Sequence, residues 1–191
     1  MKHLAKHLLA WLLVALASAG YIVYVLHLEV PPPLRPAIET VSRALTSTAN
    51  ATLPVVGEPM WVYVLRVATM IFFNNLRVDL LSASPFLGAL SYPASLTFTA
   101  WVLKLVATAK FGERWAEVAM GVIYMPHTYL ELLAYSIAFV EGCVATYYLA
   151  TKKDIPENHV KTYAVSLGIS LIVLIAAALV EAYEMALHLL A

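Results

Sequence analysis

The sequence predicts an all-α fold, a polytopic transmembrane helical bundle of about five spans with a short interfacial or re-entrant helix before Pro126. Three observations support this prediction. The 191 residues are 62% hydrophobic and only 13% charged, whereas soluble domains have roughly 45–50% apolar and about 25% charged residues. Apolar runs of about 20 residues, enough to cross a bilayer, recur along the chain. Prolines and short polar stretches separate these runs.

The first apolar run covers about residues 8–28 and follows a short basic lead. Ala17-Ser18-Ala19 resembles a signal-peptide cleavage site, but the apolar run continues past it and is too long for a typical signal peptide. We therefore expect a retained membrane anchor. The length of the chain suits a single membrane domain, residues 1–191.

The segment 29–60 is the largest predicted extramembrane part. Four prolines, at positions 31–33 and 36, open it as an extended connection. A short amphipathic helix is expected at about 37–45. Asn50-Ala51-Thr52 fits a glycosylation acceptor, which matters only if this loop faces outward, so glycosylation of Asn50 stays open.

Four more spans follow. Spans at about 61–81 and 86–109 are joined by a tight turn and form a helical hairpin. The apolar stretch 111–149 is too long for one straight span, and Pro126 divides it into a helix at about 113–125 and a span at about 127–149. The last span covers about 160–189. The basic lead and the Lys152-Lys153 loop favour a cytoplasmic N-terminus.

Several ionisable residues lie inside these spans, where each charge costs about 2.5–3.5 kcal/mol. Such residues usually face a partner or a cavity. His127 and Glu131 are four residues apart and share one helix face. The same face continues through small residues that would let another helix approach closely: Ala138, Gly142 and Thr146.

Antiparallel packing of the last two spans predicts that five ionisable side chains reach one membrane depth. They are His127, Glu131, Glu181, Glu184 and His188. Imidazole and carboxylate groups suit a divalent metal ion, so these five are candidate metal ligands and a divalent metal is a possible cofactor. The same groups would also serve as a proton relay, or as a polar cluster that fixes helix pairing.

The second and fourth spans add further polar residues. Asn74 and Asn75 are expected to form hydrogen bonds between helices. Arg77 and Asp79 are near the turn at 82–85 and are expected to extend to the membrane surface. Glu141 needs a cation or a proton, and the expected cation is Arg66 or Arg77. The predicted intramembrane polar cluster comprises Asn74, Asn75, His127, Glu131, Glu141 and Glu181.

Three stretches resemble the pattern of the stage II sporulation protein M family. They are residues 71–76 (IFFNNL), 125–132 (MPHTYLEL) and 176–182 (AAALVEA). The most specific element is Pro-His with Glu131 four residues after the histidine, together with a late Glu181 in an alanine-rich span. The resemblance covers about residues 8–190. This chain departs from the family at Thr128, where glycine is usual, and at Glu141, where a small residue is commoner.

The resemblance implies a non-enzymatic membrane protein that organises a membrane-remodelling or envelope complex. The expected partners are the lipid bilayer and either another copy of the chain or an envelope protein. The chain lacks the HExxH, GxSxG and P-loop motifs, which argues against an enzyme. An ion- or solute-transport component with an intramembrane His/Glu/Asn path is the alternative, and a metal-binding membrane protein is a further one. Twelve basic residues balance twelve acidic ones, so no basic excess favours nucleic acid.

Overall fold

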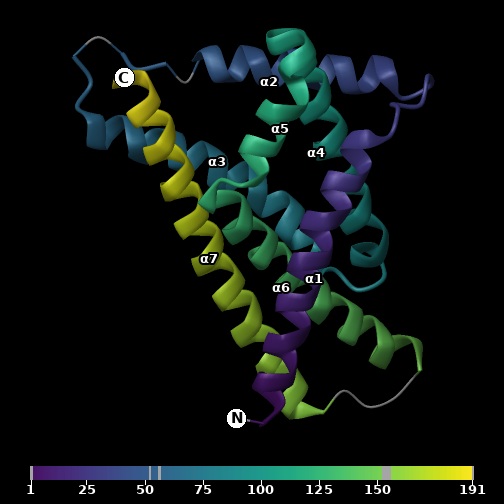
Figure 1. The fold of residues 1–191 in the computed structure, drawn as a ribbon. Helices are drawn as coiled ribbons and strands as arrows, with labels where there is room; N and C mark the ends of the chain where they lie inside the picture. The colour runs from purple at the N-terminus through teal and green to yellow at the C-terminus, as the bar shows by residue number, and fades with distance from the viewer. Residues whose placement is uncertain (1, 52, 56, 152–155, 191) are drawn as a thin grey trace.

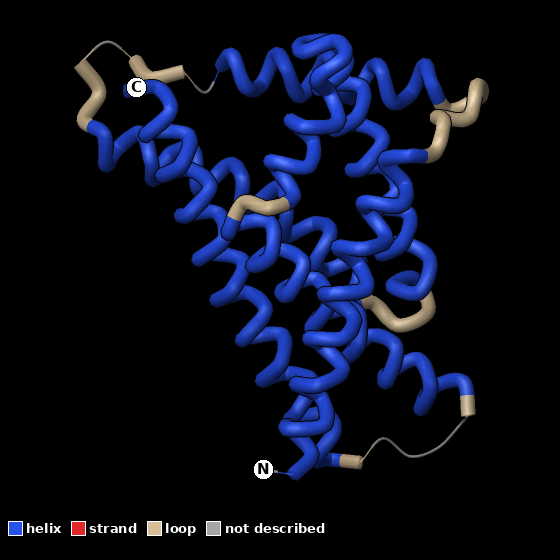
Figure 2. The backbone as a smooth tube through the Cα atoms, viewed as in Figure 1, coloured by secondary structure: helices blue, strands red, loops and turns tan. Residues whose placement is uncertain are grey.

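The computed structural model describes residues 2–51, 53–55, 57–151 and 156–190. Within these ranges every regular element is a helix, as Figure 2 shows by its colouring. The helices in chain order are α1 (Lys2–His27), α2 (Arg35–Ala51), α3 (Met60–Ala83), α4 (Leu87–Phe111), the 3-10 helix η1 (Gly112–Arg114), α5 (Trp115–Ile123), α6 (Pro126–Ala150) and α7 (Glu157–Leu190). The predicted all-α fold class is therefore confirmed.

Three of the described helices are long and apolar enough to cross a membrane. They comprise His7–His27 in α1, Pro126–Ala150 in α6 and Glu157–His188 in α7. Helices α3 and α4 have the length of a span but do not meet this criterion, so the predicted count of five spans is not confirmed. The polar residues of α3, which include Arg66, Arg77 and Asp79, lower its hydropathy.

The order of helices follows the sequence pattern closely. The short helix predicted before Pro126 is present as η1 and α5, and Pro126 begins α6 where the missing N–H of proline costs nothing. In segment 29–60 the helix α2 is longer than predicted and lies across one end of the bundle (Figure 1). Thr52, and the side chain of Asn50, lie outside the described part of the chain, as do Lys152 and Lys153.

Helices α6 and α7 form an antiparallel pair, and α3 and α1 pack against it (Figure 1). Ala178, Ala182 and Ala186 are buried on one face of α7 against Tyr63 and Val67 of α3. Because alanine carries only a methyl group, the two helices approach closely along this face. Large apolar side chains elsewhere on α1 and α7 remain exposed, as expected for surfaces that face lipid.

The end of α3 lies very close to α6. A Cβ atom added at Gly142 would lie 2.6 Å from the backbone oxygen of Ser82, so only glycine fits there without movement. Ala138 is fully buried on the same face, and Thr146 Oγ1 accepts a 2.8 Å hydrogen bond from the backbone N–H of Phe86. The predicted small-residue face is confirmed, and the segment that packs on it is the α3–α4 turn.

Candidate functional site

The first turn of α6 holds one polar pair of the site. Met125 is extended and Pro126 is the first residue of α6, which places His127 in the opening turn. The Nδ1 atom of His127 lies 2.6 Å from Oε2 of Glu184 on α7. The two side chains are 12% and 23% exposed, so this pair is largely withdrawn from the surface. The predicted antiparallel register of the last two spans brings these residues together.

One turn further along α6, Glu131 contacts helix α3. Asn75 Nδ2 of α3 donates a hydrogen bond to Glu131 Oε1. Glu181 lies on α7 one turn from Glu184, within electrostatic range of both His127 and Glu131. Glu131 and Glu181 are thus two neighbouring carboxylates without a described basic residue other than His127 beside them. We name His127, Glu131, Glu181, Glu184 and Asn75 the seam cluster.

The seam cluster lacks three of the predicted residues: His188, Asn74 and Glu141, the last of which has partners on α1. His188 is exposed on α7 and takes part in none of the described contacts of the cluster. Asn74 is exposed as well, although its Nδ2 atom lies 3.4 Å from Oδ1 of Asn75. It therefore supports Asn75 from outside rather than contacting α6.

The geometry of the seam cluster shows whether its side chains are arranged to hold a metal ion. Among the residues that the structure describes, no three His, Cys, Asp or Glu side chains are grouped so that they could hold one. His127 pairs with Glu184 while Glu131 pairs with Asn75, so the nearest groups are already engaged in hydrogen bonds. The candidate metal ligands His127, Glu131, Glu181, Glu184 and His188 do not form such a group in this arrangement.

Asp79 corrects a sequence-based expectation. It is 1% exposed and does not extend to the surface, because the end of α3 is buried against α6 and α7. The hydroxyl of Ser170 on α7 lies 2.8 Å from Asp79 Oδ1 and 2.9 Å from the backbone oxygen of Ala134. Arg77 is exposed, as predicted.

Tyr135 lies near both sets of carboxylates. It is 7% exposed on α6 and lies within electrostatic range of Glu131, Glu181 and Asp79. Buried polar groups therefore follow one another along the α6–α7 interface rather than gathering at a single depth. Sequence reasoning missed Tyr135, although it follows Glu131 by four residues and so shares its helix face.

Glu141 has a different partner from the expected one. Its side chain is fully buried, and Oε1 lies 2.6 Å from His7 Nδ1 of α1. The indole N–H of Trp11 also donates to this oxygen, at 3.3 Å. Neither Arg66 nor Arg77 supplies the cation, so the expectation was wrong. His7 is 134 residues away in sequence, and nothing in the local spacing around Glu141 indicates it.

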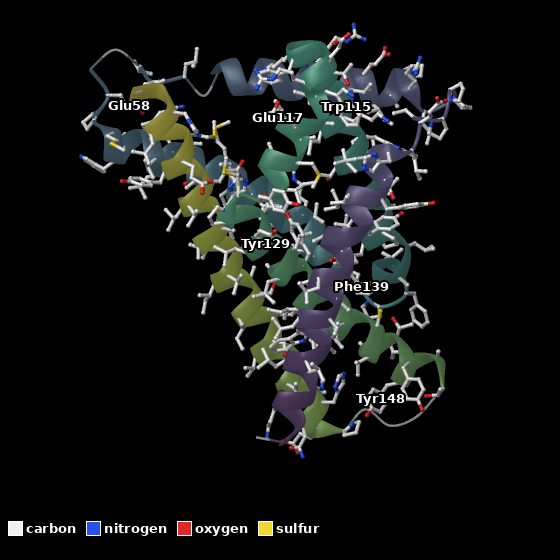
Figure 3. All side chains as sticks on the ribbon, viewed as in Figure 1. Glu58, Trp115, Glu117, Tyr129, Phe139 and Tyr148 are labelled. Carbon is white, nitrogen blue, oxygen red and sulfur yellow. The ribbon has the colours of Figure 1, made fainter. Side chains whose placement is uncertain are left out.

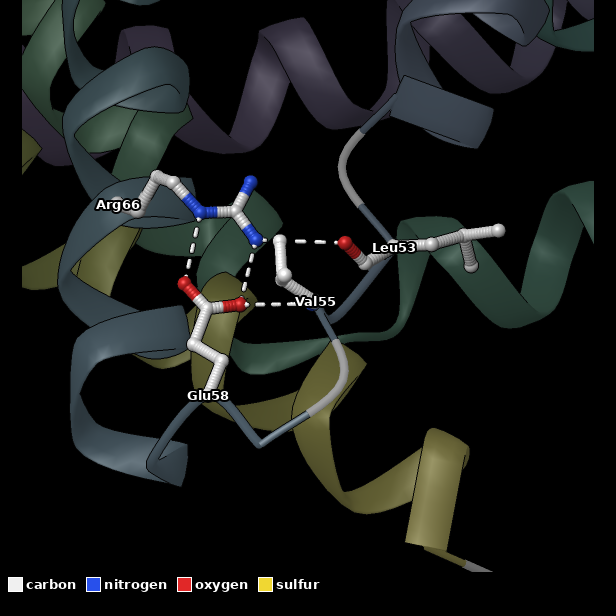
Figure 4. A network of polar contacts seen from close by, with 4 residues as sticks. All are labelled: Leu53, Val55, Glu58 and Arg66. Carbon is white, nitrogen blue, oxygen red and sulfur yellow. Dashed lines mark hydrogen bonds and ion pairs between the residues drawn. The ribbon is translucent and has the colours of Figure 1, made fainter.

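Arg66 instead fixes the segment that precedes α3 (Figure 4). Its Nε and Nη2 atoms donate to the two carboxylate oxygens of Glu58 at 3.0 and 2.8 Å, and Nη2 also donates to the backbone oxygen of Leu53 at 3.3 Å. Glu58 Oε2 accepts the backbone N–H of Val55 as well. The hydrogen bond from Arg66, followed by that from Val55, lowers the pKa of Glu58 below its ordinary value.

This network predicts that the hydrogen bond from the Val55 N–H to Glu58 weakens in acid. Because the pKa of Glu58 is lowered on folding, its contribution is complete above the ordinary carboxyl pKa of about 4.3 and is lost as the pH falls through the lower folded value. We expect the protection factor of the Val55 amide in hydrogen exchange to fall at that pH. Arg66→Gln should cause the same loss at neutral pH. Unchanged protection in both cases would contradict the network.

The fold and the seam cluster define a class: an all-helical protein with three helices apolar enough to cross a membrane and buried ionisable residues between them. A scan against protein-family models and searches of curated proteins and solved structures find no match to this chain. Its resemblance to the stage II sporulation protein M family stays a prediction.

Proposed function

We propose that this chain is a non-enzymatic, multi-pass integral membrane protein of the stage II sporulation protein M type, and that it organises a membrane-remodelling or envelope complex. One observation carries the proposal. The three stretches that resemble the family are far apart in sequence, yet their polar residues converge: Asn75 donates to Glu131, and Glu131 lies within electrostatic range of Glu181. Convergence of this kind is expected when the three stretches maintain one shared structural feature.

The proposed topology has five spans, formed by α1, α3, α4, α6 and α7. Helices α3 and α4 contain 24 and 25 residues. At 1.5 Å per residue each is roughly 36 Å long, enough for a hydrocarbon core of about 30 Å. The nine residues of α5 are too few, so α5 is a re-entrant or interfacial helix. An odd number of spans agrees with the two chain ends at opposite ends of the bundle (Figure 1), and we place the N-terminus inside.

Helix α2 supplies the surface through which such a complex would be organised. Ile38 is 1% exposed and packs against Val30 and Val102, so one face of α2 is fixed to the bundle. Glu39 and Arg43 are exposed on the same helix. Ile38 thus holds α2 to the bundle, while Glu39 and Arg43 present a polar contact surface at its end.

Photo-cross-linking of the protein in membranes tests this function, with a photo-reactive amino acid incorporated at one chosen position. At position 43 on α2 we expect one or a few adducts of defined protein mass, either a second copy or an envelope protein. At position 172, where Ile172 is 68% exposed on an apolar face of α7, we expect adducts with lipid only. If position 43 yields no protein adduct, or if both positions give the same pattern, the proposed organising function is wrong.

A second candidate function is an ion- or proton-transport component. It is favoured by the succession of buried polar groups along α6 and α7, from Glu184 and His127 through Tyr135 to Asp79. On α7 this row extends from Glu184 to Ser170, the partner of Asp79, a distance of about 21 Å along the helix at 1.5 Å per residue. That distance covers about two thirds of a hydrocarbon core of about 30 Å.

Flux in liposomes distinguishes the two candidates. Vesicles that contain the purified protein and a pH-sensitive dye would show proton movement under an imposed gradient if the row of polar groups transports protons. Glu131→Gln and Glu181→Gln would then abolish the flux, and Asn74→Gln, at an exposed position, would leave it unchanged. An organising protein shows no flux above empty vesicles in any variant.

A further inference from the structure

The short turn between α3 and α4, Ser84–Phe86, has an unusual backbone conformation. Phe86 has φ 62° and ψ −46°, and it is the one non-glycine residue with positive φ in the described part of the chain. Leu87 donates its backbone N–H to the oxygen of Pro85 at 2.7 Å, so Phe86 is the centre of a γ-turn of the rare, strained kind. A bulky residue at such angles persists only where its surroundings fix it.

Contacts from α6 and α7 hold this turn against the bundle. Thr146 Oγ1 on α6 accepts the N–H of Phe86 at 2.8 Å. The hydroxyl of Tyr163 on α7 donates to the backbone oxygen of the last residue of α3 at 2.9 Å. In the second turn of α4 the ring of Tyr92 stacks on that of Phe139 of α6, labelled in Figure 3, with 4.6 Å between the ring centroids. The turn is therefore strained in its own backbone and is fixed by other helices.

The last turns of α3 carry a buried carboxylate next to this connection. Asp79 is 1% exposed, and Ser82, three residues later on the same helix face, is 0% exposed. The hydroxyl of Ser170 lies 2.8 Å from Asp79, and no basic side chain is among the described hydrogen-bond or ion-pair partners of Asp79. Burial of a carboxylate without a basic partner is costly, and contact with water lowers that cost. Asp79 therefore favours a state in which the end of α3 admits water.

We infer that the Ser84–Phe86 turn is a strained latch that opens and closes on α6 and thereby controls the access of water to Asp79. In the closed state, which the structure shows, Thr146 fixes Phe86 and the end of α3 lies against Gly142. In the open state Phe86 relaxes to negative φ, its N–H leaves Thr146, and the last turn of α3 moves away from α6. Relief of the strain at Phe86 offsets part of the contacts that are lost on opening. The latch does not depend on the proposed function.

Thiol labelling in native membranes measures the opening. In a Cys143→Ala background, Ser82→Cys places a thiol at a position with 0% exposure, and Asp79→Cys places one on the same helix face. With a small water-soluble thiol reagent that reacts slowly relative to closing, the labelling rate is proportional to the population of the open state. We expect slow labelling at both positions. Ser136→Cys, also at 0% exposure but within α6, is the matched control and should stay unlabelled.

Two sets of substitutions should move this rate in opposite directions. Thr146→Val keeps the shape of the side chain but removes the acceptor of the Phe86 N–H, so labelling at position 82 should become about tenfold faster. Phe86→Gly and Phe86→Ala both remove the ring, but only glycine adopts positive φ without strain. Labelling at position 82 should therefore be at least about fivefold slower in Phe86→Gly than in Phe86→Ala.

Equal rates in the Phe86→Gly and Phe86→Ala variants would overturn the latch, because the turn would then store no strain. An unchanged rate in Thr146→Val, or no labelling at position 82 in any variant, would overturn it as well. Labelling at position 82 without labelling at position 79 would show that Asp79 stays covered. Labelling at position 136 in step with position 82 would report a general loosening of the bundle, and either of these last two results contradicts the inference.

Discussion

Gly142→Ala is expected to destabilise the folded bundle, and Gly168→Ala is expected not to. The added Cβ at position 142 would lie 2.6 Å from the backbone oxygen of Ser82 and 2.8 Å from that of Ala83. Both obstacles are backbone atoms, so relief requires the end of α3 to move away from α6. Overpacking of this kind costs typically 1–3 kcal/mol, more than the gain of about 1 kcal/mol from replacing glycine by alanine within a helix.

Gly168 is the matched control because it also lies inside a long helix, α7, and nothing comes within 4 Å of an added Cβ. At position 168 alanine changes only the helix propensity, so we expect the free energy of unfolding of Gly168→Ala to be unchanged or slightly higher. The free energy of unfolding of both variants is measured by denaturation in mixed detergent micelles, followed by circular dichroism. Equal effects at the two positions would mean that the close approach of the α3 end to α6 is absent.

Asn75→Leu is expected to cost about 1–3 kcal/mol, the usual penalty for a buried acceptor left without its donor. Asn75 donates to Glu131, whose other neighbour of note is the carboxylate of Glu181. Loss of the amide therefore leaves two carboxylates side by side with less compensation. Asn74→Leu, at an exposed position one residue earlier, should have little effect.

A double-mutant cycle separates this pair from general effects of substitution. If Asn75 and Glu131 act on one another, Asn75→Leu with Glu131→Leu should be less destabilised than the sum of the single variants, because no group is left unpaired. The cycle uses the same unfolding measurement in micelles. Strict additivity would show that the two side chains do not interact.

The local structure could be predicted from the sequence because helices are regular. A rise of 1.5 Å per residue and a short α6–α7 connection place Glu184 opposite His127, as the hairpin register indicates. The same register explains why His188 lies outside the seam cluster. Helix α6 begins at Pro126, so no residue of α6 remains to face a side chain one turn beyond Glu184.

The partners across more distant helices could not be predicted in this way. The contact of Glu141 with His7 depends on which helix packs beside the middle of α6, and no local spacing encodes that choice. Asp79 was assigned to the surface because it precedes a turn, yet glycines at positions 88 and 142 let that turn enter the bundle. The small residues on both sides of this turn were the signal in the sequence that it packs inside the bundle.

Cysteine cross-linking in native membranes tests the convergence of the three family-like stretches most directly. Cys143 is the only cysteine of the chain, so Cys143→Ala gives a background for paired substitutions. In that background Asn75→Cys with Glu131→Cys should be joined rapidly by a short bifunctional thiol reagent, and Asn74→Cys with Glu131→Cys should react far more slowly. Slow reaction at 75 and 131, or equal rates for the two pairs, would contradict the packing of α3 against α6 on which the seam cluster depends.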